Sequence, residues 1–230
     1  LEVDADGGAY DLAAESFHVF VPEGYSGDRP HGLLVWVSPT PHGGFATQET
    51  ERLLAERDLI WIGAHDAGNG RWGWYRVGLA LDAVHNMGRL YEIDEERIFV
   101  AGYSGGGRIS SQLTMLYPEV FDGGFFLYGV DYFEQLPVPD RPGSFWPARF
   151  PAPSKAVQER LKSDSRFVIL TGDRDFNRSQ SRAIHRRMEA DGFERLTYLQ
   201  VPDADHYTRV PPDWFARALD ALDGRDRAGE

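Results

Sequence analysis

The sequence predicts an α/β fold in which a mostly parallel sheet is covered by helices on both faces. Short apolar runs recur along the 230 residues, and most are continuously apolar, which is typical of strands buried on both faces of a parallel sheet. Helical patterns lie between these runs, and this alternation favours right-handed crossovers between parallel strands. No linker or composition shift divides the chain, so we expect one domain over residues 1–230.

The elements follow from these patterns in chain order. Strands are predicted at 16–22, 32–37, 58–64, 97–101, 123–129, 166–172 and 196–201. Helices are predicted where apolar residues have helical spacing, namely Val77, Leu81, Val84 and Tyr91, then Ile109, Leu113 and Leu116, then Ile184 and Met188, and finally Phe215, Leu219 and Leu222. The segment 131–153 is rich in proline and aromatic residues and has neither period, which predicts a long ordered surface insertion, either functional or a rigid flap.

Composition excludes several classes of function. The net charge of -12, with no run of Lys or Arg, argues against nucleic-acid binding. No window approaches the 18 or so consecutive apolar residues of a membrane span. The chain contains no cysteine, so a nucleophile must be another residue type. It begins at Leu1 rather than Met, which is consistent with a trimmed precursor and leaves localisation open.

The stretch 100–108, VAGYSGGGR, contains a G-x-S-x-G motif centred on Ser104. It follows a predicted strand and precedes a predicted helix, which is the context of a nucleophile elbow. Side chains at Gly102 and Gly106 would collide across such a turn. The N–H of Gly105 would then point to the position where an oxyanion forms. We therefore interpret Ser104 as a candidate nucleophile.

A serine hydroxyl needs a base, and the base needs an acid to orient it. With a strand–elbow–helix nucleophile, the partners follow in the order acid then histidine, on loops after later strands. His206 follows the strand 196–201, whereas His185 lies in a helical stretch, so His206 is the candidate base. Asp173 and Asp175 both follow the strand 166–172; we prefer Asp175 as the acid and interpret the other as a turn residue.

A second oxyanion donor is expected in the loop 38–44, SPTPHGG. Pro39 and Pro41 have no N–H, so Thr40 between them is the first donor that the turn can direct toward the nucleophile, with His42 or Gly43 as alternatives.

Candidate substrate-binding residues are aromatic, and each has packing within the fold as an alternative role: Tyr103, Trp72, Trp74, Phe145 and Trp146. We expect no cofactor and no metal, because the short cluster of Asp203, Asp205 and His206 has no second histidine cluster to complete a coordination shell.

The stretch 75–128 resembles the α/β-hydrolase branch that holds polyhydroxybutyrate-depolymerase-like and feruloyl-esterase-like secreted serine esterases. The resemblance is carried by IDEERIFVAGYSGGG at 93–107 and by LYPEVFDGG at 116–124, together with LTGDRDFNR at 170–178 and VPDADHY at 201–207. It implies the α/β-hydrolase fold, the triad Ser104, Asp175 and His206, and secretion. The loop 38–44 departs from the usual HG motif, and the chain lacks the cysteines of the disulfides common in secreted members.

The residues and the resemblance together predict two-step acyl transfer from an ester to water, with a small molecule, a polysaccharide or a polyester as the ester substrate. Alternatives are an amidase or peptidase using the same triad, an acyltransferase, and a non-catalytic binding protein on a hydrolase fold.

Overall fold

The computed structural model describes residues 10–44, 47–139 and 141–224. Seven strands form its main sheet: β1 (Phe17–Phe20), β2 (His31–Val37), β3 (Leu59–Ala64), β4 (Ile93–Tyr103), β5 (Gly123–Leu127), β8 (Arg166–Gly172) and β9 (Leu196–Val201). Their spatial order is β1-β3-β2-β4-β5-β8-β9. Only the edge strand β1 pairs antiparallel in this sheet; every other neighbouring pair is parallel. The predicted mostly parallel sheet is confirmed, with a strand in each of the seven expected places.

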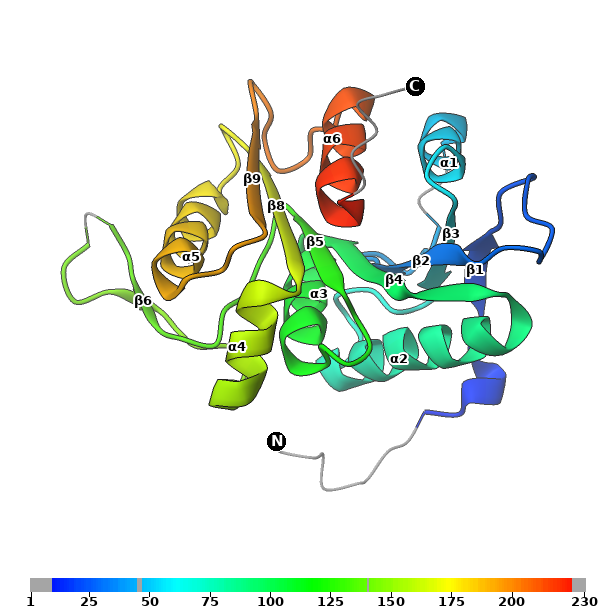
Figure 1. The fold of residues 1–230 in the computed structure, drawn as a ribbon. Coiled ribbons are helices and arrows are strands. Elements are labelled where there is room, and N and C mark those ends of the chain that lie inside the picture. Colours follow the sequence, from blue (N-terminus) through cyan, green and yellow to red (C-terminus); the bar gives the residue numbers. More distant parts are fainter. Residues whose placement is uncertain (1–9, 45–46, 140, 225–230) are drawn as a thin grey trace.

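Helices cover both faces of the sheet, because alternate residues of each strand point to opposite sides. The helices are α1 (Gln48–Ala55), α2 (Gly73–Leu90), α3 (Gly105–Leu116), α4 (Lys155–Ser163), α5 (Arg178–Asp191) and α6 (Pro212–Asp223). Leu34 and Trp36 of β2 pack in the core under α1 and α6, whereas Leu33 and Val35 pack in the core under α2 and α3. Helices α4 and α5 complete that second face with α3. Figure 1 shows α1 and α6 on one side of the sheet and α2, α3 and α4 on the other.

Two helices were missed by the sequence analysis because they are short and mostly polar. The α1 helix is capped by Thr47, whose side chain accepts the N–H of Thr50, and it buries Leu53 and Leu54. The α4 helix is capped by Ser154 and buries only Leu161. With so few apolar positions, neither helix gives a helical period that can be read from the sequence.

The segment 131–153 is anchored at its base and extends outward at its tip. Tyr132, Phe133 and Phe150 are buried in the core beside α4 and α5. Between them, β6 (Leu136–Pro137) pairs antiparallel with β7 (Phe145–Trp146). Figure 1 shows this hairpin projecting beyond α5. Residue 140 lies outside the described ranges; in the rest of the segment, the aromatic residues are divided between core packing and the surface.

In the described ranges, none of the helices has the length and the apolar character needed to cross a membrane. Over the same ranges, no cluster of three or more His, Asp or Glu side chains could hold a metal ion.

Candidate active site

Ser104 lies in a strained turn between β4 and α3. Its backbone has φ 53° and ψ -117°, a conformation that costs a non-glycine residue about 1–3 kcal/mol and is most often found at functional sites. The turn is closed by glycines, since a Cβ on Gly106 would lie 1.8 Å from the carbonyl oxygen of Val37. A Cβ on Gly102 would lie 2.4 Å from the carbonyl carbon of Gly106. The sequence therefore folds locally into an elbow that only glycine at both positions allows.

Ser104, His206 and Asp175 are joined by two hydrogen bonds. The Nε2 atom of His206 lies 2.9 Å from Ser104 Oγ, and its Nδ1 atom lies 2.9 Å from Asp175 Oδ1. The three residues follow β4, β8 and β9, whose carboxyl ends meet at one edge of the parallel sheet. The side chains of His206 and Asp175 are 5% and 0% exposed, so little water screens their interaction. This arrangement can move a proton from the serine hydroxyl to the imidazole while the carboxylate fixes the ring tautomer.

The candidate acid, Asp175, accepts hydrogen bonds from two further donors. Thr171 donates its hydroxyl to Asp175 Oδ2 at 2.7 Å, and the N–H of Asn177 donates to Asp175 Oδ1 at 3.0 Å. Asp173, the alternative acid, uses its own N–H to bond the carbonyl of Val201, and its carbonyl accepts a bond from Arg178. These bonds use the backbone of Asp173; the carboxylate within hydrogen-bond distance of His206 Nδ1, at 2.9 Å, is that of Asp175.

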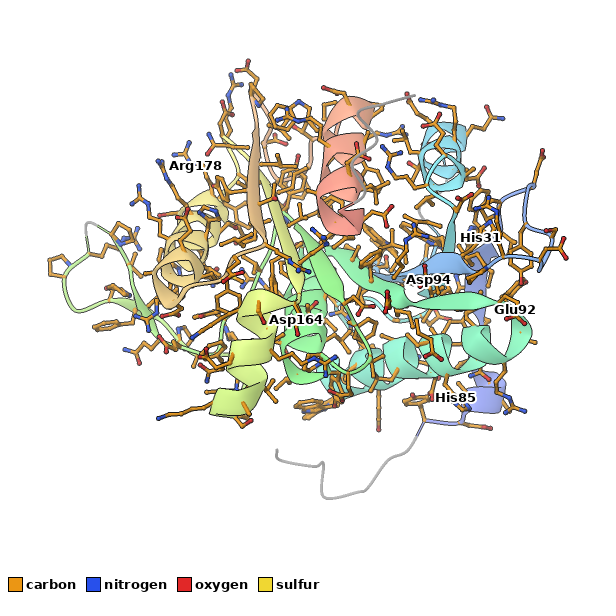
Figure 2. All side chains as sticks on the ribbon, in the orientation of Figure 1. His31, His85, Glu92, Asp94, Asp164 and Arg178 are labelled. Carbon is orange, nitrogen blue, oxygen red and sulfur yellow. The ribbon has the colours of Figure 1, made fainter. Side chains whose placement is uncertain are left out.

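Figure 2 places this loop within the molecule. Arg178, labelled there, is the first residue of α5 and marks the end of the acid loop. Asp164, also labelled, caps the C-terminus of α4 just before β8 begins. The loop therefore lies at the carboxyl end of β8, as expected for a site at the carboxyl edge of a parallel sheet.

The histidine loop is fixed by local hydrogen bonds and by Tyr103. Asp205 Oδ1 accepts bonds from the N–H of Tyr207 at 2.9 Å and from the hydroxyl of Thr208 at 2.8 Å. Tyr103, predicted as a substrate-binding residue, donates its hydroxyl to the carbonyl of His206. Burial, with the nearby charge of Asp175, raises the pKa of Tyr103 to about 12, so the phenol stays a neutral donor around neutral pH. Tyr103 thus holds the backbone of His206 in place.

The two predicted oxyanion donors differ in place: one N–H lies at the start of a helix, and the other already donates a hydrogen bond. The N–H of Gly105, the first residue of α3, is one of the helix-start groups that have no intrahelical acceptor. The N–H of Thr40, in contrast, donates to Ser38 Oγ at 3.1 Å. The alternative at Gly43 donates to His65 Nδ1 at 3.3 Å. The role of Thr40 as an oxyanion donor stays a prediction, and its N–H already has an acceptor in Ser38 Oγ.

Sequence analysis missed a polar pair beside the elbow. A Cβ on Gly105 would lie 2.0 Å from Asn69 Oδ1, so the Asn69 side chain lies directly against the backbone after Ser104. Arg76, which is 5% exposed, donates to the carbonyl of Ser38 at 2.9 Å and to Asn69 Oδ1 at 3.4 Å. Burial lowers the pKa of Arg76 to about 10, so it still carries its charge at neutral pH. These residues are separated along the chain from Ser104, and no motif marks them.

The predicted aromatic residues are distributed over several surfaces. Trp74 packs against the core under α2, and Trp146 packs against the core beside α4 and α5. Trp72, at the start of α2, is 49% exposed, and Phe145, on β7, is 52% exposed. A role of these four residues in substrate binding stays a prediction.

Two exposed aromatic rings also lie against the candidate base. The ring of Phe176 lies 4.1 Å from that of His206, centroid to centroid, and the ring of Tyr207 lies 5.3 Å away. They directly follow Asp175 and His206 in the sequence. Each ring is the single aromatic residue of its short loop, so no aromatic cluster in the sequence marks it. Its position directly after a candidate acid or a candidate base is the signal that could have identified it.

Neither a protein-family model nor a curated protein sequence matches this chain. Solved structures do. A ferulic acid esterase superposes with a TM-score of 0.66 at 17% identity, over 91% of this chain and 90% of that one. The chain has the α/β-hydrolase fold. An S-formylglutathione hydrolase, FrmB, from Staphylococcus aureus superposes with a TM-score of 0.61 at 12% identity, over 91% of each chain.

A thermostable esterase is also similar, with a TM-score of 0.60 at 16% identity over 83% of this chain. This chain spans 51% of the length of that esterase. The neighbours therefore share the fold with this chain at low sequence identity, and a shared fold does not by itself carry a shared function.

Proposed function

We propose that this protein is a serine carboxylesterase that works through an acyl-enzyme on Ser104. The observation that carries the proposal is the continuous hydrogen-bond chain from Ser104 through His206 to Asp175, built on an elbow whose positive φ exposes the serine. Structural similarity to esterases at low identity is consistent with it.

In the first step, His206 Nε2 accepts the proton of Ser104 while Oγ attacks the carbonyl carbon of the ester. The tetrahedral intermediate collapses when the C–O bond to the alcohol breaks, and Nε2 returns the proton to the departing oxygen. Water then enters the same position and gives a proton to Nε2 as its oxygen attacks the acyl carbon. The bond between the acyl carbon and Oγ breaks, and Nε2 returns the proton to Ser104 Oγ. Asp175 holds the imidazole in the tautomer that leaves Nε2 free to accept.

The oxyanion is stabilised by the N–H of Gly105 and, once Ser38 Oγ is displaced as its acceptor, by the N–H of Thr40. Each such donor typically lowers the barrier by about 3 kcal/mol. Because Thr40 starts engaged, its contribution is smaller than that of a preformed donor, by the free energy needed to open its bond to Ser38.

The proposed substrate class rests on the resemblance of the sequence to secreted serine esterases. We place the protein with the polyhydroxybutyrate-depolymerase-like and feruloyl-esterase-like branch, acting on esters of small molecules, polysaccharides or polyesters. One domain, with the hairpin of 131–153 as its insertion, and a secreted location belong to the same proposal.

The test is hydrolysis of p-nitrophenyl acetate and butyrate by the wild type and by the Ser104→Ala variant. Loss of the nucleophile from an intact triad lowers kcat by about 10⁶-fold. Ser163→Ala is a matched control, since Ser163 ends α4 and bonds only to its own turn and Asp164. Circular dichroism checks that both variants fold.

An active Ser104→Ala variant contradicts the nucleophile assignment. If the wild type cleaves p-nitroanilides faster than the matching esters, the protein is an amidase or peptidase instead. Faster transfer to an added alcohol than to water identifies an acyltransferase, and binding without turnover of any of these substrates identifies a binding protein.

A further inference from the structure

We infer that Phe176 and Tyr207 form the subsite for the alcohol part of the ester, and that this subsite takes an alcohol bearing a ring with an apolar face, either an aromatic ring or a pyranose. The inference rests on the proposed function and names part of its substrate class.

The two rings flank the imidazole and remain open to solvent. Phe176 is tilted by 33° to the His206 ring at 4.1 Å, and Tyr207 meets it edge-on, at 88° and 5.3 Å. Phe176 is nevertheless 68% exposed and Tyr207 is 83% exposed, whereas His206 itself is 5% exposed. Exposed apolar surface gathered beside a buried polar group is a feature of ligand-binding sites.

Both rings are held in place by the turns that hold the triad. The N–H of Asn177 bonds to Asp175 Oδ1 at 3.0 Å and the N–H of Arg178 bonds to the carbonyl of Asp175 at 3.1 Å, which closes a tight turn around Phe176. On the other loop, Asp205 accepts the N–H of Tyr207. A fixed backbone lowers the entropy lost when a ligand orders the side chain, so the rings are preorganised for binding.

The chemistry decides which half of the ester they contact. His206 Nε2 must give its proton to the oxygen of the departing alcohol, so that oxygen comes within hydrogen-bond distance of Nε2. The carbon attached to it then lies beside the imidazole, and groups that flank the imidazole meet the alcohol. The acyl carbon, in contrast, is bonded to Ser104 Oγ and its chain extends from the elbow. Phe176 and Tyr207 are therefore on the leaving-group side.

Flat rings discriminate between alcohols by shape. An aromatic ring packs offset or edge-on against another ring, and the apolar face of a pyranose packs in the same way, while a short alkyl chain covers little of the surface. Aromatic pairs gain roughly 0.5–1.5 kcal/mol beyond burial of area, which corresponds to a preference of about two- to tenfold in kcat/KM.

The experiment compares three esters with one acyl group: ethyl butyrate, benzyl butyrate and methyl 6-O-butyryl-glucopyranoside. The protein is used as the full chain, in wild-type, Phe176→Ala and Tyr207→Ala forms. Leu90→Ala is the matched control, because Leu90 is an apolar residue, 73% exposed, at the C-terminal end of α2. The readout is the ratio of kcat/KM between a ring ester and ethyl butyrate.

We expect the ratio to fall about two- to tenfold in both aromatic variants and to stay unchanged in Leu90→Ala. A fall confined to the benzyl ester identifies an aromatic alcohol, and a fall confined to the glucoside ester identifies a sugar alcohol; either supports the subsite. If the truncations only loosen His206, all three esters slow by the same factor and the ratio is constant, which overturns the inference.

An acyl series separates the two halves of the substrate. Ethyl phenylacetate against ethyl butyrate varies the ring on the acyl side, and the inference requires that ratio to be unaffected in Phe176→Ala. A change there assigns Phe176 to the acyl group and overturns the inference. Failure of the proposed function gives a different result from failure of this inference: ethyl butyrate hydrolysis then persists in Ser104→Ala.

Discussion

Replacing Thr171 by valine removes one hydrogen bond to the candidate acid with little change of shape. Thr171 is fully buried, and its hydroxyl donates to Asp175 Oδ2 at 2.7 Å. The Asp175 side chain is 0% exposed, so water cannot take the place of the lost donor. Asp175 Oδ1 keeps its bonds to His206 and to the N–H of Asn177. The variant therefore tests the contribution of the bond to Oδ2 alone.

The expected magnitude comes from the charge and the burial. A hydrogen bond to a charged group contributes about 1.5–3 kcal/mol to the free energy of unfolding. The loss lies in the upper part of this range when the acceptor is buried and is left without a donor. For a protein of this size, 1 kcal/mol shifts the thermal midpoint by about 2–4 °C, so Thr171→Val should lower it by about 3–12 °C. Activity should change little: the bond is made equally in the ground state and the transition state, and it involves the oxygen that His206 does not contact.

The assay pairs urea denaturation with steady-state kinetics. Thr171→Ser is the matched variant, since it keeps the hydroxyl and removes only a methyl group, at a cost of about 0.5–1.5 kcal/mol. We expect Thr171→Val to be the less stable of the two and to keep kcat on p-nitrophenyl butyrate within about threefold of the wild type.

Two results would refute this reasoning. If Thr171→Val is as stable as Thr171→Ser, the hydroxyl does not stabilise the carboxylate. If kcat falls by orders of magnitude while stability is preserved, the bond to Asp175 acts in the transition state and the division between the two carboxylate oxygens is wrong.

Three further predictions concern the candidate acid, a half-buried carboxyl and the elbow. Asp175→Asn should lower kcat by about 10⁴-fold, because the amide favours the wrong imidazole tautomer, while Asp173→Asn should retain most activity; the reverse order in p-nitrophenyl butyrate assays identifies Asp173 as the acid. Burial raises the pKa of Asp122 above its usual value, so its stabilising contribution is present at low pH and is lost as pH rises through the folded pKa. Asp122→Asn should therefore be more stable than the wild type near pH 7, with the advantage disappearing near pH 3, as measured by thermal midpoints; a constant difference contradicts this. Gly106→Ala should destabilise the protein by at least about 2 kcal/mol or prevent folding, because its Cβ would overlap the Val37 carbonyl, and a thermal midpoint equal to that of the wild type would show that the elbow relaxes.

The strands of the sheet were predictable because burial on both faces leaves a continuous apolar run. The run at 32–37, GLLVWV, is fully buried as β2, and the run at 166–172, RFVILTG, forms β8 with only its first residue partly exposed. The short helices α1 and α4 were not predictable, because each buries few residues and depends on a capping Thr47 or Ser154 whose role is clear only in three dimensions.

The candidate triad was predictable from strand order and loop position, since Ser104, Asp175 and His206 each follow a strand of the parallel sheet. The surroundings were less so. The N–H of Thr40 was expected to be directed toward the nucleophile, and in the structure it donates to the hydroxyl of Ser38, two residues earlier. Asn69 comes beside the elbow through folding of a distant loop, and nothing in its local sequence marks that contact.

The central claim is that Ser104 is the nucleophile, and covalent labelling tests it most directly. Diisopropyl fluorophosphate reacts with an activated serine by forming a P–Oγ bond and releasing fluoride, and peptide mass spectrometry then locates the adduct. The account predicts one adduct per chain, on Ser104, with ester hydrolysis lost in proportion to labelling, and no adduct in Ser104→Ala. An adduct on another residue, or ester hydrolysis that continues in a protein fully labelled at Ser104, would contradict it.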